Sequence, residues 1–587
     1  MTGAWGYRHA GERRCAALLS FRRSNLISKW LEQAKRGQAV WLPDVREGCA
    51  RMEDAVPVTM QLTLCDGSKR DFSLPLPRWQ NEQEQRFVKQ YVTACVYNTL
   101  SACSGREMAF YLDARESEAA ALLGQLDEVF QVRRTARSGY GKVINIADRL
   151  CRAFGGGRFA FAVRPQEDYS PAPDAAPVQG QLTERLRQAA ARCGSGVCCG
   201  IDIGGTDIKA AVAADGRLVC VKEYDWNPAA SPTAEGIIAP IELLVRLMAC
   251  CAAGLTPALE RALDKNAGDA VMAQAVAESL SVPLDVLGVS FPDVVIRDRI
   301  VGGETPKTQG MRSNPAADYE DAFAELGGLL ERLQPLCREG AALHMTNDGH
   351  IAAFTAAAEL AWSGKPDFSG GVIAHALGTD FGMGFLAPDG TIPEMPMELY
   401  DFLLDMGSFP QRELPADDLR STRNENSGLP GARRYLGQAA AFRLAWDGDP
   451  ALLDGFTQER DGLLTVPTEK RKPCLAHLMT QAAQGNAAAQ EVFRRVGRHI
   501  GQINREMAPL LLPRTNVRYL FGRFVKEPAC FRLLQEGCRE IVPELVLEAA
   551  DEELSVTPLM QALEAKGVTV AQFGQAIGAM YYDAMER

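Results

Sequence analysis

The sequence predicts an α/β protein built from more than one domain, and three observations support this. The chain has 587 residues, which is too long for one compact core. A polar, proline-rich stretch at residues 164–181 separates an N-terminal region from the rest. Beyond it, strand-like apolar runs alternate with helical patterns, which is typical of α/β sheets.

Composition and charge narrow the class of protein. The chain is 47% apolar and 23% charged, as soluble globular proteins are. Its net charge of −11 argues against a broad nucleic-acid-binding surface. The sequence has no apolar run long enough to span a membrane and no pattern typical of a secretory signal. We therefore expect a cytoplasmic protein with neither a nucleic acid nor a membrane as partner.

The 16 cysteines are scattered along the chain and include no CxxC pair. Disulfide scaffolds are normally small and secreted, so we expect reduced and mostly buried thiols. The six histidines do not cluster with cysteines at ligand spacing, so no structural zinc is expected.

The N-terminal region, residues 1–163, is predicted to be an α+β domain, and its sequence does not reveal its role. Residues 56–77 predict a hairpin that turns at Asp66-Gly67. Residues 81–100 have the pattern of an amphipathic helix, and residues 107–113 that of a strand. A linker over 164–196 is expected to follow.

Residues 197–345 and 346–587 are predicted to form two lobes of similar build. Each lobe contains a hairpin whose tip reads Gly-Thr-Asp and whose next turn reads Asp-Gly. The second lobe is expected to carry an irregular, charged insertion at about 408–475, followed by a long amphipathic helix over 487–511.

The two tips consist of Gly204, Gly205 and Thr206 in the first lobe and Gly378 and Thr379 in the second. Glycine lets backbone approach a ligand closely, successive N–H groups form an anion-binding turn, and threonine adds a hydroxyl donor. The pair therefore indicates a phosphate site between the lobes. The alternative is that each tip only turns the chain.

Asn347 and Asp348 follow a strand and open a helix. A carboxylate at such a junction can serve as a general base, which accepts a hydroxyl proton during phosphoryl transfer. The alternative is that Asp348 only caps the helix.

These motifs together resemble the ROK family of sugar kinases and sugar-responsive repressors, within the actin, Hsp70 and hexokinase-like superfamily. "GIDIGGTDIKAAV" and "ALGTDFGMG" are similar to its phosphate loops, and "NDGHIAA" to its Asn-Asp motif. "GVSFPDVV", "ETPKTQGM" and "FGQAIGAMYY" resemble its proline loop, sugar-contacting loop and C-terminal helix. The resemblance covers roughly residues 197–587. It implies a two-lobed actin/hexokinase-like (ribonuclease H-like) fold with an additional N-terminal domain.

The resemblance also implies a site for ATP, Mg²⁺ and a sugar. Asp202 would hold Mg²⁺ through a water. Asn347, Asp348 and Glu398 would bind the sugar, and Asp348 would also be the base. The residues implied to contact ATP are Asp202, Gly204, Gly205, Thr206, Lys209, Gly378, Thr379 and Gly522.

Three departures from the family pattern keep other functions open. The family's cysteine-rich zinc motif is missing, Asp380 stands where a small residue is usual, and "YLFGRFVKEP" keeps only Gly522 of a glycine-rich adenosine loop. The first hypothesis is an ATP-dependent, glucokinase-like sugar kinase. The second is a sugar-binding sensor or scaffold that has lost catalysis, and the third a transcriptional regulator. The oligomeric state stays open, with a homodimer as one option.

Overall fold

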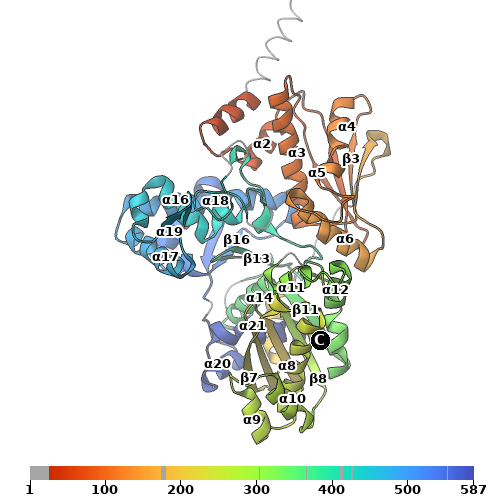
Figure 1. Ribbon diagram of the computed structural model, residues 1–587, viewed down its shortest axis with the longest axis vertical. Coiled ribbons are helices and arrows are strands. Elements are labelled where there is room, and N and C mark those ends of the chain that lie inside the picture. Colours follow the sequence, from red (N-terminus) through yellow and green to blue (C-terminus); the bar gives the residue numbers. More distant parts are fainter. Residues whose placement is uncertain are drawn as a thin grey trace, which may run out of the picture. The chain divides into compact units, whose positions relative to one another are not determined.

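The computed structural model describes residues 26–173, 180–302, 305–364, 367–408, 414–424, 428–551 and 553–586. The chain divides into two compact units (Figure 1). Unit 1 contains residues 1–174, 399–512 and 536–543, and unit 2 contains residues 175–398, 513–535 and 544–587. Parts of the expected N-terminal region, linker and insertion lie outside the described residues, as does Glu304 of the "ETPKTQGM" motif.

Unit 1 contains a four-stranded sheet in the order β2-β1-β3-β4. The predicted hairpin is present as β1 (Thr59–Thr63) and β2 (Lys69–Ser73), and the predicted strand as β3 (Glu107–Leu112). Strand β4 (Ala160–Pro165) pairs parallel to β3. The predicted helix is α3 (Glu82–Ala102), which begins where the Asn81 side chain accepts the N–H of Glu84. The region is therefore α+β, as predicted.

The other helices of the N-terminal part of unit 1 are a helix at 26–35, α2 (Leu42–Ala50), α4 (Ser117–Leu123), α5 (Leu126–Val129) and α6 (Lys142–Phe154). Residues 399–512 add α15 (Arg433–Leu436), α16 (Gln438–Gly448), β14 (Gln458–Arg460), β15 (Leu463–Thr465), α17 (Thr468–Ala483) and α18 (Ala487–Leu511). Helix α19 (Pro528–Ile541) begins in unit 2 and ends in unit 1.

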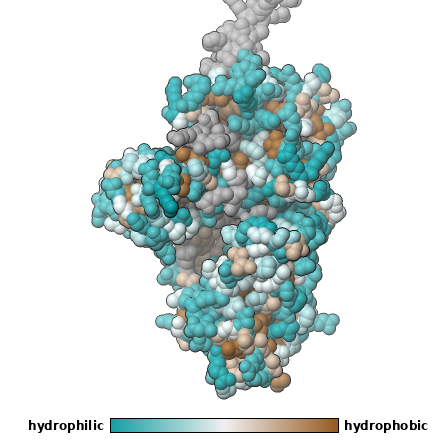
Figure 2. Space-filling model, viewed as in Figure 1, coloured by the Kyte–Doolittle hydropathy of each residue, from teal (hydrophilic) through white to brown (hydrophobic). Residues whose placement is uncertain are grey.

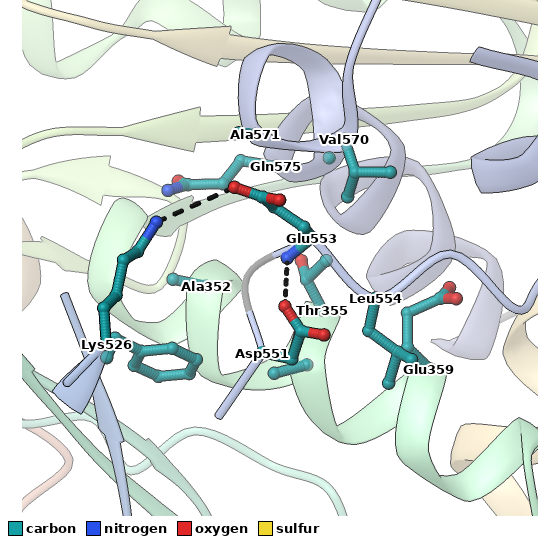
Figure 3. Close-up of a pocket in the computed structure, with 13 residues that line it drawn as sticks. Ala352, Thr355, Glu359, Lys526, Asp551, Glu553, Leu554, Val570, Ala571 and Gln575 are labelled. Atoms are coloured by element: carbon teal, nitrogen blue, oxygen red, sulfur yellow. Dashed lines mark hydrogen bonds and ion pairs between the residues drawn. The ribbon is translucent and has the colours of Figure 1, made fainter. Parts of the chain in front are cut away.

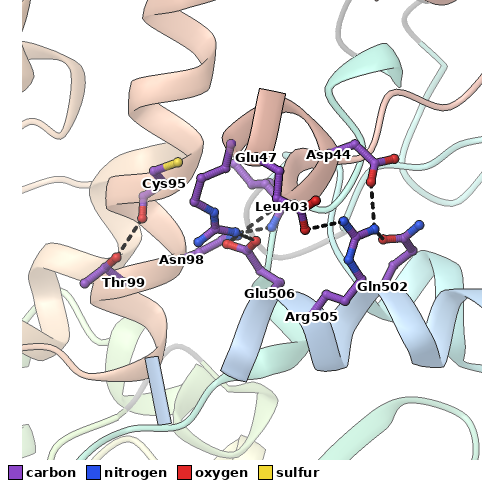
Figure 4. Close-up of polar contacts among 10 residues, drawn as sticks. Asp44, Glu47, Cys95, Asn98, Thr99, Leu403, Gln502, Arg505 and Glu506 are labelled. Carbon is purple, nitrogen blue, oxygen red and sulfur yellow. Dashed lines mark hydrogen bonds and ion pairs between the residues drawn. The ribbon is translucent and has the colours of Figure 1, made fainter. Parts of the chain in front are cut away.

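A buried polar cluster ties the N-terminal helices to α18 (Figure 4). Glu506 is 1% exposed, forms an ion pair with Arg46, and accepts the Asn98 amide N–H at 2.9 Å. Arg505, one position earlier on α18, forms ion pairs with Asp44 and Glu47 on α2, at 2.7 and 2.6 Å. Removing one partner of the buried Arg46–Glu506 pair is costly, because it leaves the other charge without compensation.

The first sheet of unit 2 has the order β11-β8-β5-β6-β7. Strands β5 (Val197–Ile203), β6 (Asp207–Ala214) and β7 (Arg217–Asp225) form an antiparallel meander. Strands β8 (Leu284–Phe291) and β11 (Cys337–Asn347) continue the sheet in parallel with β5. Helix α8 (Glu235–Ala253) packs against this sheet, with its apolar side chains in one core cluster with those of β5, β6 and β8.

The second sheet has the order β13-β12-β16-β17. Strands β12 (Val372–Leu377) and β13 (Phe381–Leu386) form a hairpin, and β16 (Val517–Phe521) and β17 (Val546–Ala549) pair in parallel beyond β12. Each sheet thus runs from an antiparallel hairpin into two parallel strands. This repeated order confirms the predicted α/β class with two lobes of similar build.

Helices α14 (Asp348–Trp362) and α21 (Val570–Glu586) pack against each other, with α14 on the second sheet and α21 on the first (Figure 1). Glycines make this close packing feasible. A Cβ on Gly200 would lie 1.9 Å from the Ala576 carbonyl oxygen, and one on Gly288 would lie 2.1 Å from that of Ala579. Helix α7 (Leu182–Arg192) packs on both helices.

The remaining elements of unit 2 are short. They are α9 (Pro257–Leu263), α10 (Asp269–Ala277), β9 (Val295–Ile296), β10 (Arg299–Ile300), α11 (Gln309–Arg312), α12 (Tyr319–Gly327), α13 (Leu329–Leu333) and α20 (Pro558–Ala565).

The units divide the chain differently from the expected domain ranges, which stay a prediction. Residues 399–512, including α18, belong to unit 1, whereas the sequence places them in the second lobe. The expected insertion at 408–475 contains helices and a small hairpin, so it is more regular than its charged sequence indicates. The expected linker at 164–196 contains helix α7, whose Leu182 and Leu186 are fully buried.

The drawn face is mostly hydrophilic, with small hydrophobic patches (Figure 2). Among the described helices, α8 alone is long and apolar enough to cross a membrane, and 56% of its most apolar window is buried. A core helix passes the same test. The described cysteines form no disulfide, and all but Cys337 are buried. Cys15 lies outside the described residues.

Candidate functional site

The first Gly-Thr tip is the loop over residues 204–206, between β5 and β6. Some of its backbone N–H groups and carbonyls form hydrogen bonds, and others do not. The Gly204 N–H donates to the Asp207 carbonyl at 2.8 Å. Trp226, just beyond β7, donates its backbone N–H to the Thr206 carbonyl at 3.0 Å and its indole N–H to the Gly204 carbonyl at 3.1 Å.

This bonding leaves donors available at the tip. The backbone N–H groups of Gly205 and Thr206 donate to no partner among the described residues, and both residues are exposed. The Thr206 hydroxyl makes only a long contact of 3.4 Å with the Asp207 carboxylate. Adjacent unused N–H groups on a fixed turn are the arrangement that binds an anion.

The second tip covers residues 378–380, between β12 and β13. The Gly378 N–H donates to the Asp380 carbonyl at 3.0 Å, a closing bond like that of the first tip but one residue shorter in span. Thr379 is exposed, and a Cβ on Gly378 would meet no atom within 4 Å. The structural repeat therefore extends to the hydrogen bonding of the tips.

Gly522 lies directly against the second tip. It follows β16 with a φ of +94°, and an added Cβ would lie 2.3 Å from the carbonyl oxygen of Leu377, the last residue of β12. Both the backbone conformation and the space at this position require glycine.

Asp202 lies near the end of β5, between β6 and β8. Its carboxylate accepts the Ser290 hydroxyl at 2.8 Å. Burial, with the nearby charge of Asp348 as a further cause, raises its pKa to about 6. A cation beside Asp202 would offset the free-energy cost of keeping this carboxylate ionised in a poorly solvated position. Asp202 therefore fits a role in holding Mg²⁺.

Few other ligands for a metal lie nearby. Among the described residues, no three His, Cys, Asp or Glu side chains form a metal-binding group. Any Mg²⁺ at Asp202 would take its other ligands from water and phosphate oxygens, which is common for this ion.

Lys209 lies opposite Asp202 on β6 and forms an ion pair with Asp207. It therefore neutralises a carboxylate at the base of the first tip. This position is consistent with its predicted role at the phosphates, although its ammonium group is already paired with Asp207.

Asn347 and Asp348 stand at the junction of β11 and α14, as predicted. The cap of α14 is Asn347, whose side-chain oxygen accepts the Gly349 N–H at 2.9 Å. The alternative that Asp348 serves as the cap residue is therefore wrong, because Asp348 is already the first residue of the helix. Its carboxylate also contacts the Gly349 N–H, at 2.8 Å.

The pKa of Asp348 is subject to opposing influences. Burial raises the pKa of its carboxyl group, and the ammonium of Lys307 opposes that rise. A raised pKa makes the ionised carboxylate a stronger base.

The start of α14 packs tightly on the second hairpin. A Cβ on Gly349 would lie 2.4 Å from the Met383 carbonyl oxygen, and one on Gly384 would lie 2.3 Å from the Gly349 carbonyl oxygen. These close approaches fix the helix start, and with it Asp348, relative to β13.

Lys307 was missed by the sequence analysis. Its Cε lies 3.4 Å from where a Cβ on Gly205 would stand, and its Nζ donates to the Pro292 carbonyl at 3.1 Å. The next carbonyl, that of Asp293, accepts the Asn347 amide at 2.9 Å. One loop thus holds Lys307 beside the Asn-Asp motif and the first tip. The only sequence signal was a lysine inside the "ETPKTQGM" motif.

A pocket of about 250 Å³ opens between α14, α21 and the ends of β16 and β17 (Figure 3). Phe521 and Lys526, on either side of Gly522, line it together with Ala352, one helical turn after Asp348. Lys526 and Glu553 form an ion pair of 3.7 Å at its edge, and Glu359 and Asp551 add carboxylates. A partly apolar pocket with a few polar groups is typical of a small-molecule site.

Glu398 is half-buried and is the last residue of the first segment of unit 2. Its role in a sugar site stays a prediction. The other predicted site residues belong to the two tips, to the strand ends beside them, or to the start of α14.

The sequence matches no protein-family model and no curated protein. Solved structures do resemble this chain. A ROK family glucokinase from Streptomyces griseus, in complex with glucose and AMPPNP, is 19% identical with a TM-score of 0.35, over 65% of this chain and 98% of its own. The ROK hexokinase from Thermus thermophilus is 15% identical with a TM-score of 0.36, over 65% and 98%.

A ROK family transcriptional regulator, described as a homologue of the E. coli MLC protein, is 11% identical with a TM-score of 0.38, over 67% of this chain and 81% of its own. These scores are low, so the assignment of the fold rests on the strand order of the two sheets. The chain is similar in structure to ROK family sugar kinases, the family that its sequence motifs resemble.

Proposed function

We propose that this protein is an ATP-dependent kinase that phosphorylates a sugar hydroxyl. The observation that carries the proposal is the position of Asp348. It is a half-buried carboxylate with a raised pKa, at a helix start that packs on the second hairpin, and its charge interacts with that of Asp202 beside the first. A base so close to two phosphate-type tips suits phosphoryl transfer.

In this proposal the tips hold the phosphates of ATP. The N–H groups of Gly205 and Thr206 and the hydroxyls of Thr206 and Thr379 would donate to phosphate oxygens. Gly204, Gly378 and Gly522 allow the backbone its close turns, and Lys209 neutralises Asp207. Asp202 would hold Mg²⁺, which supplies positive charge to the phosphates when bound.

The pocket lined by Phe521 and Lys526, close to Gly522, would bind the nucleoside of ATP. Its lining joins apolar surface from Phe521 and Val570 with the carboxylate of Asp551. An adenine ring offers a flat apolar face and an amino donor, which suit such a lining. The sequence pattern had indicated an eroded adenosine loop, yet a pocket remains at this position.

In the reaction, Asn347 and Glu398 would orient the sugar, and Asp348 would accept its hydroxyl proton. The sugar oxygen forms a bond to the terminal phosphorus as the bond from that phosphorus to the bridging oxygen breaks. The electron pair leaves with ADP. A cytoplasmic location and small-molecule partners, with neither nucleic acid nor membrane involved, complete the proposal.

The experiment is a titration of MgATP by calorimetry, followed by a phosphorylation assay on a panel of sugars. Binding together with turnover of one sugar supports the kinase. Sugar binding without turnover would instead support the second hypothesis, a sensor or scaffold. No nucleotide binding at millimolar MgATP would overturn the proposal.

A further inference from the structure

Lys307 has a position that the proposed residues do not explain. It lies on the short turn Pro306–Thr308, whose Thr308 is 3% exposed and accepts the Tyr319 hydroxyl at 3.1 Å. A Cβ on Gly310, two residues further, would lie 2.2 Å from the Ser231 carbonyl oxygen. The backbone below Lys307 is therefore held on two sides, so its side chain projects from a fixed base.

The side chain of Lys307 reaches the first tip. Its Cε is beside Gly205, and its Nζ makes one hydrogen bond, to the Pro292 carbonyl. An ammonium group has three donors, so two remain to meet a ligand. Lys209, the other lysine at this tip, is already paired with Asp207.

The local charge balance calls for such a cation. Asp202, Asp207 and Asp348 bring three carboxylates to the region that would receive a polyphosphate, and each repels an anion. Lys209 offsets one of them. Negative charge that shifts among phosphate oxygens during transfer needs fixed positive charge nearby.

We propose that Lys307 is a catalytic residue that binds the terminal phosphate of ATP and stabilises that group during its transfer. The inference rests on the proposed kinase function and adds a residue to it. The hydroxyl proton goes to Asp348, so Lys307 takes no part in proton transfer.

Two simpler roles for Lys307 predict different results. It could only brace the Pro292 loop, or it could only keep Asp348 ionised by its charge. In the second case Lys307→Gln moves the acid limb of the pH–rate profile to higher pH, because the pKa of Asp348 rises, but the rate recovers at high pH. If Lys307 contacts the phosphate, kcat stays low on the high-pH plateau.

The first test compares Lys307→Gln with Lys566→Gln. The control lysine bonds the Val219 carbonyl on β7, near the end of that strand away from the first tip. We expect kcat on the plateau to fall roughly 10²–10³-fold for Lys307→Gln, as for other lost transition-state donors, and to be unchanged for the control. A plateau kcat within about threefold of wild type, with normal folding by circular dichroism, would overturn the inference.

The second test uses binding and needs no turnover. Lys307→Gln should weaken a non-hydrolysable ATP analogue about 10–100-fold, the effect of one charge-assisted hydrogen bond, and leave ADP nearly unchanged. Equal losses for both nucleotides would contradict a contact with the terminal phosphate. If the wild type binds neither nucleotide, the kinase function itself fails, and that outcome differs from a failure of Lys307 alone.

Discussion

The two lobes of unit 2 carry the same tip on different supports. In the first lobe, the chain turns at Asp215-Gly216 and returns as β7, which delivers Trp226 to the tip. In the second lobe, the equivalent turn at Asp389-Gly390 is followed by no third strand within the described residues. There the tip rests against Gly522, which follows the neighbouring parallel strand.

The difference shows how one loop chemistry can be kept while its scaffold changes. The first tip is fixed by hydrogen bonds donated from a side chain and a backbone amide, and the second by close backbone approach. Mutations should therefore harm the two tips by different routes: loss of a donor at the first, and a steric clash at the second.

The largest effect is expected at Asp348. This residue belongs to neither tip, and in the proposed reaction it is the base for the phosphate that both tips hold. Asp348→Asn removes the basic carboxylate and leaves the Asn347 cap in place, so we expect the rate of phosphoryl transfer to fall roughly 10²–10⁴-fold with little change in melting temperature. Turnover numbers and thermal melts of both proteins check this.

Asp318→Asn is the matched control, because Asp318 is the N-cap of α12 and accepts the Asp321 N–H at 3.1 Å. Asparagine caps about as well as aspartate, so this variant should behave as wild type. Turnover of Asp348→Asn within threefold of wild type would rule out Asp348 as the base.

The glycines of the second tip sharpen the comparison. Gly522→Ala places a methyl group 2.3 Å from the Leu377 carbonyl oxygen at a φ of +94°, whereas Gly378→Ala meets nothing within 4 Å. We expect the first change to cost roughly 2–4 kcal/mol of stability and to weaken nucleotide binding, and the second to cost under about 1 kcal/mol. Denaturant melts should separate the two variants; similar melts would show that the second tip can shift freely.

The threonines test whether both tips bind phosphate. Thr206→Val and Thr379→Val each remove an exposed hydroxyl with little change in shape. Each should weaken MgATP about tenfold, the effect of one hydrogen bond to a charged group. Calorimetric affinities of the two variants give the answer. If only Thr206→Val has an effect, the second tip is merely a turn.

The last prediction concerns stability without ligand, at Asp202. Its folded-state pKa of about 6 exceeds its usual 3.8, so the folded protein binds the proton more tightly. Stability from this group is full below about pH 4 and is lost as the pH rises through 6. Asp202→Asn should raise the melting temperature at pH 7.5, by an amount equivalent to roughly 1–3 kcal/mol, and have much less effect at pH 4.5. An equal shift at both pH values would contradict this account.

Sequence patterns predicted the local features of the site. The paired tips, the strand before Asn347 and the helix after it depend on short-range spacing and turn chemistry, which a single sequence contains. Lys307 and Trp226 were missed because their roles depend on contacts with residues far along the chain. Nothing in the pattern around a lone lysine or tryptophan reveals such a neighbour.

The packing of unit 1 could not be predicted from the sequence either. Helix α18 was predicted with its observed bounds, yet two of its packing partners, α2 and α3, lie near the other end of the sequence. Amphipathic periodicity predicts that a helix buries one face, but it does not say against what. Helix α7 was obscured by the proline-rich segment before it.

The Arg46–Glu506 pair has a consequence for how the protein is made. Asn98 and Glu506 are 408 positions apart, and Arg46 and Glu506 are 460 apart. At about 5–20 residues per second, a ribosome needs roughly 20–80 s to bring α18 out after α3. During that time the faces of α2 and α3 that await α18 are uncovered. Synthesis of this chain should therefore depend on holding chaperones, and its refolding from denaturant should be slow, since such distant contacts form late.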